Sequence, residues 1–291
     1  MKYGFVPALG TPLDSNGGLI AESYKKQINR MIDAGAKALL CMGSMGQQAF
    51  IESDECVKVA ACACEAAGGR LPVFVGAMDN SIARARARVA SMEHLPLTAF
   101  VLTTPYYEID TDEQVMKYFR GVASATKHGI ILYDLPSVTK YKINYGMLCQ
   151  LRRDIPNLMG IKSADLNMLR KVRLNPEFEG FEIFYSGLDN FDVVYPWGLG
   201  YVLDGMPTCT PVNTEKLIAA MDNGDKAGAA EALNNIIYYR DLMLELDLWP
   251  AYSASMNMLG FEGLHAPDWV TESSEETRKI LKDALIKIGE L

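Results

Sequence analysis

The sequence is poor in histidine and in basic charge, and it contains no long apolar run. Its 291 residues include 3 His, and 28 Lys and Arg stand against 36 Asp and Glu, which gives a net charge of −8. Binding to a nucleic-acid backbone requires a clustered basic face, so this acidic excess disfavours that function. No stretch of about eighteen uncharged apolar residues occurs, so we predict no membrane-spanning helix.

The beginning of the sequence also lacks the charged and long apolar regions of a signal peptide. Six cysteines are present, but none has the Cys-x-x-Cys spacing that is typical of metal and redox sites. Cys62 and Cys64 would point about 200° apart on a helix, so they cannot hold one ion together. We therefore expect a cytoplasmic protein with buried thiols in a reducing compartment, the alternative being a free surface cysteine.

Short apolar runs alternate with amphipathic segments along the first 205 residues, which is the pattern of repeated βα units. The 49% of hydrophobic residues are enough for one large core or two modest ones. The expected strands cover residues 3–9, 36–42, 72–77, 99–104, 129–134, 158–162, 182–186 and 201–205. The expected helices between them include residues 22–34, 54–67, 81–93 and 112–127.

Eight such units favour a closed barrel over an open doubly wound sheet. The alternation is unbroken, and no strand is followed by a Gly-x-Gly-x-x-Gly turn. After residue 225 the pattern becomes helical, over residues 226–245, 251–259 and 275–288. The sequence therefore predicts a (β/α)8 TIM barrel over residues 1–225, with a helical C-terminal extension over residues 226–291 that packs on the barrel.

The carboxyl ends of the strands are where such a barrel carries its chemistry. These ends offer several hydroxyl groups and one lysine but no histidine, over residues 43–47, 103–107, 133–136, 160–162 and 186–189. Lys162 ends an apolar strand, so its amine is either a solvated cap or a group held in the barrel mouth. In an apolar mouth the ammonium form is disfavoured, and a neutral amine can form a Schiff base with a carbonyl carbon.

Two further groups could act beside that amine. Tyr133 ends the preceding strand and could relay protons if its side chain faces the same way, although a tyrosine often only anchors a barrel rim. The turn at Ser44 and Met45 lies between two glycines and before a helical segment. It could aim backbone N–H groups at a carboxylate, or its glycines could serve turn geometry alone.

Taken together, these motifs resemble those of the dihydrodipicolinate synthase / N-acetylneuraminate lyase family of Schiff-base-forming class I aldolases. The resemblance covers essentially the whole chain, C-terminal helices included, because the motifs occur in the family's order and spacing. The matching motifs are Gly43 to Gly46, Pro105-Tyr106-Tyr107, Tyr133-x-x-Pro136, Gly160-Ile161-Lys162 and Ser186-Gly187-x-Asp189.

The resemblance implies that Lys162 forms a Schiff base with the keto carbon of pyruvate or another 2-oxo acid. Tyr133 would shuttle protons together with the hydroxyls of Ser44 and Tyr107, and Tyr107 reaches into a neighbouring subunit's site in the family. No metal or other cofactor is implied. Members of the family are commonly tetramers built from tight dimers, so the resemblance also implies a homo-oligomer.

The same resemblance assigns the substrate-binding positions. The backbone of Ser44 and Met45 would hold the substrate carboxylate, and Gly187 and Leu203 would line the pyruvate pocket. Asp189 matches a position that helps to bind substrate hydroxyls in the sialic-acid lyase branch.

Three departures from the family pattern bear on the second substrate. Met45 stands where a second Thr is usual, which removes a hydroxyl but keeps the backbone donor, and Gln47 replaces the usual Glu. Val138 stands where dihydrodipicolinate synthases carry an Arg that receives the carboxylate of the second substrate, and Lys140 is a poor replacement for that planar fork. Condensation with aspartate semialdehyde is therefore disfavoured.

The sequence thus predicts a class I aldolase or lyase that uses pyruvate and an uncharged or hydroxylated aldehyde, for example a 3-deoxy-2-oxo sugar acid as the joined product. A dehydratase on the same intermediate, a dihydrodipicolinate synthase proper and a catalytically silent relative remain as alternatives. A metal-dependent barrel enzyme is disfavoured, because His94 and His128 precede their strands at the opposite face and His265 lies in the helical tail.

Overall fold

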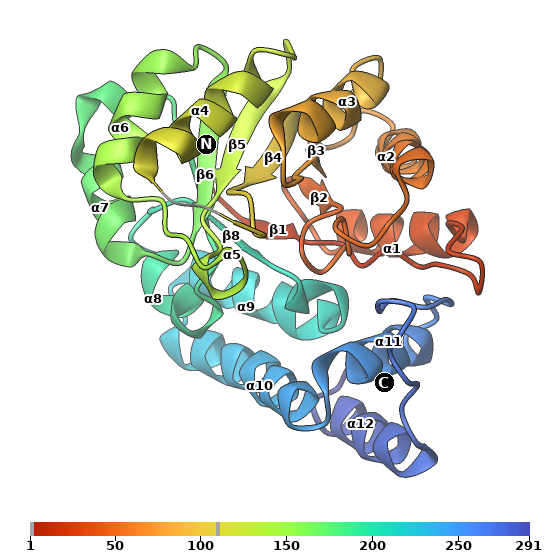
Figure 1. Cartoon of the computed structure of the whole chain (residues 1–291). Coiled ribbons are helices and arrows are strands. Elements are labelled where there is room, and N and C mark those ends of the chain that lie inside the picture. The colour runs from red at the N-terminus through yellow and green to blue at the C-terminus, as the bar shows by residue number, and fades with distance from the viewer. Residues whose placement is uncertain (1–2, 109–110) are drawn as a thin grey trace.

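The computed structural model describes residues 3–108 and 111–291 and shows eight parallel strands wound into a nearly closed barrel, with helices outside (Figure 1). The strands pair in the order β1-β8-β7-β6-β5-β4-β3-β2, and a bridge between Ala8 and Leu40 links β1 to β2. The predicted (β/α)8 TIM barrel is confirmed. The strands are β1 Phe5–Pro7, β2 Leu39–Cys41, β3 Val73–Gly76, β4 Ala99–Thr103, β5 Gly129–Tyr133, β6 Leu158–Ser163, β7 Glu182–Tyr185 and β8 Tyr201–Asp204.

The helices lie close to their expected positions. The helix expected over residues 112–127 ends at Ala123, and the helix expected from residue 251 begins at Leu248, because Pro250 is tolerated in a first turn. The α-helices are α1 Ala21–Asp33, α2 Ser53–Ala67, α3 Ile82–Met92, α4 Asp112–Ala123, α5 Pro136–Thr139, α6 Tyr145–Asp154, α7 Leu166–Leu174, α8 Phe191–Val194, α9 Pro211–Asn223, α10 Lys226–Glu245, α11 Leu248–Met258 and α12 Glu275–Lys287. Three short 3-10 helices are η1 Pro176–Phe178, η2 Leu188–Asn190 and η3 Met206–Thr208.

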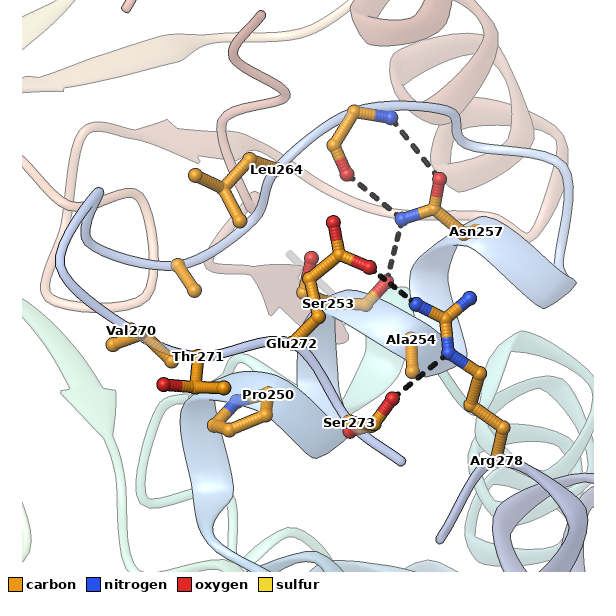
Figure 2. A pocket seen from close by; sticks show the side chains of 12 residues that line it. Pro250, Ser253, Ala254, Asn257, Leu264, Val270, Thr271, Glu272, Ser273 and Arg278 are labelled. Atoms are coloured by element: carbon orange, nitrogen blue, oxygen red, sulfur yellow. Dashed lines mark hydrogen bonds and ion pairs between the residues drawn. The ribbon is translucent and has the colours of Figure 1, made fainter. Parts of the chain in front are cut away.

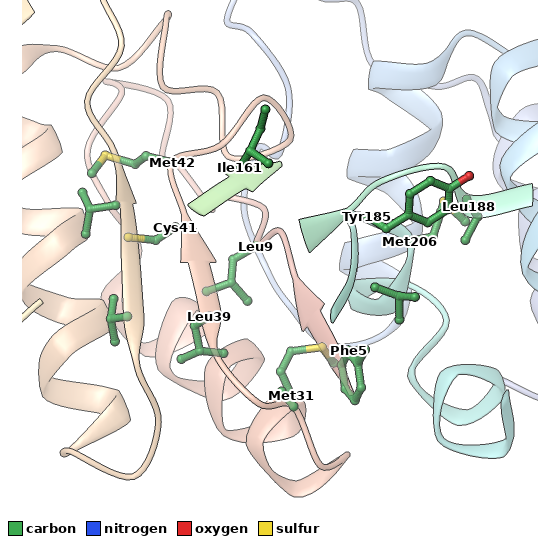
Figure 3. Packing of buried hydrophobic residues seen from close by; sticks show 14 of the residues in the cluster. Phe5, Leu9, Met31, Leu39, Cys41, Met42, Ile161, Tyr185, Leu188 and Met206 are labelled. Carbon is green, nitrogen blue, oxygen red and sulfur yellow. The ribbon is translucent and has the colours of Figure 1, made fainter. Parts of the chain in front are cut away.

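Side chains along the strands alternate between the barrel interior and the surrounding helices. The outward set, which includes Phe5, Leu39 and Cys41, packs with Met31 of α1 in the large core between strands and helices (Figure 3). The inward set forms a separate cluster of Val6, Ala8, Ala38, Leu40, Phe74, Ala99, Val101, Ile131, Tyr133, Phe184 and Leu203.

The C-terminal segment contacts four loops that follow strands, and these loops belong to the neighbouring strands β7, β8, β1 and β2. Figure 1 shows its helices α10, α11 and α12 gathered on one side of the barrel. The segment therefore covers part of the carboxyl end of the barrel. The contacting pairs are Arg240 with Asp189, Tyr252 with Thr208, Leu264 with Leu13 and Ala266 with Gln47.

Two sequence expectations concern thiols and membranes. All six cysteines are free, and Cys149 alone among them is partly exposed, so the prediction of buried thiols is confirmed for the others. Within residues 3–108 and 111–291, no helix combines the length and the apolar character that crossing a membrane requires.

His265 is buried in the loop between α11 and α12. The sequence places it in the helical C-terminal segment without assigning it to a loop. Its ring stands edge-on to that of Tyr252, with 6.1 Å between the ring centroids, and its Nε2 lies 2.9 Å from the Phe261 carbonyl oxygen. Burial lowers the pKa of His265 from 6.5 to about 4. The folded protein therefore keeps this imidazole neutral, whereas an unfolded chain protonates it below about pH 6.5.

We expect His265 to make folding stability fall as the pH is lowered from 7.5 to 5. The unfolded state binds the additional proton in this range, so the folded state loses about 2 kcal/mol from this residue. His265→Gln should flatten the pH dependence of the free energy of unfolding, measured by urea titration at both pH values, by that amount. His94→Gln, at an exposed position, is the control, and an equal pH dependence in wild type and His265→Gln would contradict the prediction.

Candidate active site

Tyr133 of β5 and Lys162 of β6 are opposite partners in the parallel ladder. Directly paired residues in such a ladder face the same side, and Tyr133 belongs to the interior cluster, so both side chains enter the barrel. Lys162 is 3% exposed and Tyr133 is 4% exposed, and the Lys162 Nζ lies 4.1 Å from the centroid of the tyrosine ring. The structure thus brings together the two residues that the sequence placed at adjacent strand ends.

The surroundings of the Lys162 amine are largely apolar. Phe184 is the partner of Lys162 on β7, and Leu203 of β8 also points into the barrel. The ring face of Tyr133 offers a cation–π contact to the ammonium form. The expected role of Leu203 in lining a pyruvate pocket stays a prediction.

Ser44 supplies a hydroxyl next to the tyrosine. Its Oγ lies 3.4 Å from the Tyr133 Oη, at the long end of the hydrogen-bonding range. Neither Ser44 nor Met45 donates a backbone hydrogen bond to the part of the chain that the structure describes. The role of these two N–H groups in holding a carboxylate stays a prediction.

Gly46, at the end of this turn, must be glycine because the backbones of Met42 and Leu9 pass very close to it. A Cβ on Gly46 would lie 2.7 Å from the Met42 nitrogen and 2.9 Å from the Leu9 carbonyl oxygen. Real Cβ atoms do not approach backbone atoms so closely, so a larger residue would push the turn away from the barrel.

Gln47 ties the back of the turn to the C-terminal segment. With its amide nitrogen facing the Ala266 carbonyl oxygen, it donates to that oxygen at 2.8 Å and accepts from the Ala266 N–H at 3.0 Å. An amide can do both, whereas a carboxylate can only accept. A glutamate at this position could not donate to the Ala266 carbonyl oxygen, so the contact favours Gln here.

Asp204 is the last residue of β8, and the Met45 side chain lies against Gly205, which follows it. The Met45 side chain lies so close to Gly205 that a Cβ there would be 2.4 Å from the Met45 Cγ. Burial raises the pKa of the adjacent Asp204 carboxyl, and the Met206 N–H, which donates to it at 2.9 Å, and the charge of Lys162 oppose part of that rise. The sequence analysis missed Asp204, although a charged residue that ends an apolar strand is the same signal that identified Lys162.

Tyr107 is not part of this cluster within one chain, because its side chain is 88% exposed. Its position is nevertheless held by the backbone. The Tyr106 and Tyr107 N–H groups both donate to the Asn80 Oδ1, at 2.8 and 3.0 Å. Asn80, in the loop after β3, is a second residue that the sequence analysis missed.

Asp189 and Gly187 lie in the segment after β7. Arg240 of α10 grips both oxygens of Asp189 at 2.8 Å, and this pairing holds the pKa of the Asp189 carboxyl below its usual range. A Cβ on Gly187 would lie 2.3 Å from the Tyr185 Oη, so the tyrosine hydroxyl takes the place of a side chain there. Asp189 is therefore committed to an ion pair rather than free at the mouth.

Val138 is 56% exposed on the short helix α5, directly after β5. It offers a neutral, apolar side chain at the position where the sequence resemblance led us to expect an arginine in a dihydrodipicolinate synthase. Within the described residues, no group of three or more histidines, cysteines or carboxylates lies close enough to hold a metal ion.

A cavity of about 260 Å³ in the C-terminal segment is distinct from this cluster (Figure 2). Its charged and amide groups are already paired, since Arg278 binds Glu272 and the Ser273 carbonyl oxygen, and Asn257 binds backbone carbonyl oxygens. None of the residues predicted from the sequence lines it. It contains no lysine, so we take the Lys162 cluster as the candidate site.

Comparison with known proteins agrees with this geometry. The model of the Dihydrodipicolinate synthetase family matches residues 1–287. The chain is similar to the 4-hydroxy-tetrahydrodipicolinate synthase of Stutzerimonas stutzeri, with 30% identity over 302 residues and 100% of each chain covered. It is also similar to that of Thermotoga petrophila, with 27% identity over 297 residues and 99% of each chain covered.

A solved structure agrees in fold. It is that of a prophage protein of the dihydrodipicolinic acid synthase family from E. coli in complex with pyruvate, with a TM-score of 0.88 and 19% identity, covering 99% of this chain and 98% of that one. The chain therefore belongs to the dihydrodipicolinate synthetase family, and it is a carbon–carbon lyase of the aldolase type.

Proposed function

We propose that the protein is a class I aldolase in which Lys162 forms a Schiff base with pyruvate. The observation that carries this proposal is the placement of a buried amine 4.1 Å from the Tyr133 ring, inside a barrel of this family. The Ser44 hydroxyl beside Tyr133 and the available N–H groups of Ser44 and Met45 support it.

In the proposed mechanism the neutral Lys162 amine attacks the keto carbon of pyruvate, whose carboxylate accepts hydrogen bonds from the Ser44–Met45 turn. Tyr133 delivers the proton with which the carbinolamine hydroxyl leaves as water, and an iminium ion remains. The Tyr133 phenolate then takes a proton from the methyl carbon to give an enamine, which attacks the aldehyde carbon, and the phenol returns that proton to the new alkoxide. Addition of water then releases the 2-oxo acid product and the free amine, and cleavage is the reverse sequence.

The charges around the mouth favour an aldehyde without a carboxylate. Val138 supplies no positive charge, Arg240 is already neutralised by Asp189, and the Asp204 carboxyl at the end of β8 interacts with the charge of Lys162. A hydroxylated aldehyde can donate to carboxylate oxygens, whereas an anionic one would be repelled. The activity for which the relatives are named, 4-hydroxy-tetrahydrodipicolinate synthase, is the second candidate, and a dehydratase acting on the same iminium is a third.

The proposed active form is a homo-oligomer. Tyr107 is mostly exposed, so its phenol can join the Tyr133–Ser44 hydroxyl pair only in the site of another copy. The backbone of Tyr107 is held by Asn80, which would present the side chain in a fixed direction.

Borohydride reduction in the presence of pyruvate should leave a stable adduct on Lys162, identified by peptide mass mapping. Lys162→Arg should abolish the adduct, because a guanidinium does not form a Schiff base under these conditions. Lys142→Arg, a substitution at a half-exposed lysine after β5, should keep it. An adduct on a different lysine, or its persistence in Lys162→Arg, would refute the proposal.

Exchange of the pyruvate methyl hydrogens with deuterium oxide, followed by NMR, should report enamine formation without any aldehyde. Tyr133→Phe should slow this exchange about 100-fold, and Ser44→Ala should slow it by a smaller factor, because the hydroxyls move protons. Tyr238→Phe, on α10 and outside the site, should exchange at the wild-type rate. Exchange in Tyr133→Phe as fast as in wild type would remove Tyr133 from the mechanism.

Val138→Arg should raise turnover of aspartate semialdehyde about tenfold or more relative to glyceraldehyde, since charge-assisted hydrogen bonds to a carboxylate are strong. The measurement is the ratio of kcat/KM for the two aldehydes with pyruvate. Val193→Arg, at an exposed site on α8, is the matched control. An unchanged ratio would show that the specificity argument is wrong even if the adduct on Lys162 forms.

A further inference from the structure

A small polar cluster lies directly behind the Tyr133–Lys162 pair, on the outer side of the barrel wall. Asp134 follows Tyr133 in the chain and Ser163 follows Lys162, so each faces away from the interior. The Ser163 Oγ donates to the Asp134 Oδ2 at 2.8 Å, and the Ile143 N–H donates to the Oδ1 at 3.0 Å. Both Asp134 and Ser163 are buried.

The cluster begins where the backbone ladder between the two strands ends. The Asp134 N–H donates to the Lys162 carbonyl oxygen at 2.9 Å, which is the last backbone bond of this edge. After this bond the chain leaves β5 and turns into α5. The side-chain hydrogen bond between Asp134 and Ser163 then links the two strands in place of a further backbone bond. Ser163 is also held by its other neighbour, because the Ser186 N–H donates to its carbonyl oxygen at 3.0 Å.

Lys142 and Asp165 complete the cluster, Lys142 next to the Asp134 carboxylate and Asp165 next to the Ser163 hydroxyl. The Lys142 Nζ lies 3.7 Å from the Asp134 Oδ2 and 2.7 Å from the Asp165 Oδ2. The Asp165 N–H donates to the Ser163 Oγ at 3.0 Å, so this oxygen accepts one hydrogen bond and donates another. A buried carboxylate with this many partners has one defined geometry.

We propose that Asp134 is a positioning residue, which acts through Ser163 and the Ile143 N–H to keep the Tyr133 phenol and the Lys162 amine at their working separation. The proposal rests on the function proposed above. Asp134 and Ser163 face away from the barrel interior, where the substrate would bind. Asp134 therefore acts on the reaction only through Tyr133, which precedes it in the chain, and through Lys162, which precedes Ser163. Proton transfer depends steeply on such separations, and a shift of about 1 Å in a reacting group can cost about 100-fold in rate.

A purely structural role would have a different signature. It would lower stability when the contact is removed and leave the rate of the folded enzyme unchanged. A positioning role instead lowers the maximal rate of proton transfer, whereas the half-saturating pyruvate concentration stays near that of wild type because the Ser44–Met45 turn is untouched.

The test compares Asp134→Ala, Asp134→Asn and Ser163→Ala by deuterium exchange into pyruvate. Asp134→Ala should lower the maximal exchange rate about 10- to 100-fold, with the half-saturating pyruvate concentration within about twofold of wild type. Asp134→Asn should recover most of the rate, since its amide can accept from the Ile143 N–H and donate to the Ser163 Oγ. Ser163→Ala should lower the rate in the same direction, and the double variant Asp134→Ala/Ser163→Ala should be no slower than Asp134→Ala alone.

Asn213→Ala is the matched control, because Asn213 is also a buried polar residue with several hydrogen bonds, at the start of α9 and outside the site. It should lower the melting temperature without changing the exchange rate. Full-rate exchange in folded Asp134→Ala and Ser163→Ala, with the borohydride adduct on Lys162 present, would overturn the positioning role alone. Absence of both adduct and exchange in the wild type would overturn the aldolase proposal, and the positioning role with it.

Discussion

The register between β5 and β6 is the constraint on which this site depends. Tyr133 and Lys162 face each other across the ladder, and the pairing shifts by one residue between Ile130 and Ile131, where Met159 is passed over. Side chains alternate along a strand, so a slip of one position would turn Lys162 from the barrel interior to the helix side. The irregularity thus decides that an amine, rather than the neighbouring Ile161, enters the barrel.

The carboxyl end of the barrel is held in two different ways. The loops after β7, β8, β1 and β2 contact the C-terminal segment, and Gln47 fixes the Ser44–Met45 turn in this way. On the other side the loops hold one another through single side chains. Asn80 binds the loop after β4, and Asp134, directly after β5, binds Ser163 at the end of β6. The groups that face the Lys162 amine are therefore supported by contacts far from it in sequence.

The charge distribution near the mouth is the basis of the proposed preference for an uncharged aldehyde. The guanidinium of Arg240 is held by both Asp189 and Asp241, and the Asp204 carboxyl lies at the end of β8. Val138 itself is exposed and neutral, and the nearest cations on the α5 side are Lys140, whose Nζ donates to the Ser137 carbonyl oxygen, and Lys142, which pairs with Asp165. A 2-oxo acid would still find the free N–H groups of the turn, because backbone donors do not depend on the identity of the side chains around them.

The sequence by itself determined the barrel and the lysine. Eight apolar runs of strand length, alternating with amphipathic helices, admit few other folds, and a lysine that ends such a run is conspicuous because charged residues are rare inside barrels. Periodicity also placed Tyr133 at the end of the adjacent strand. It could not decide whether the two side chains face one another, because that depends on the skipped residue at Met159.

Only the tertiary structure showed that Arg240 pairs with Asp189, that the Tyr107 side chain is mostly exposed, and that the charge of Lys162 acts on the Asp204 carboxyl. Local patterns report which residues lie in a strand or helix, since those depend on neighbours three or four positions away. Contacts such as that between Arg240 and Asp189 join residues 51 positions apart, and they exist only once the chain has packed.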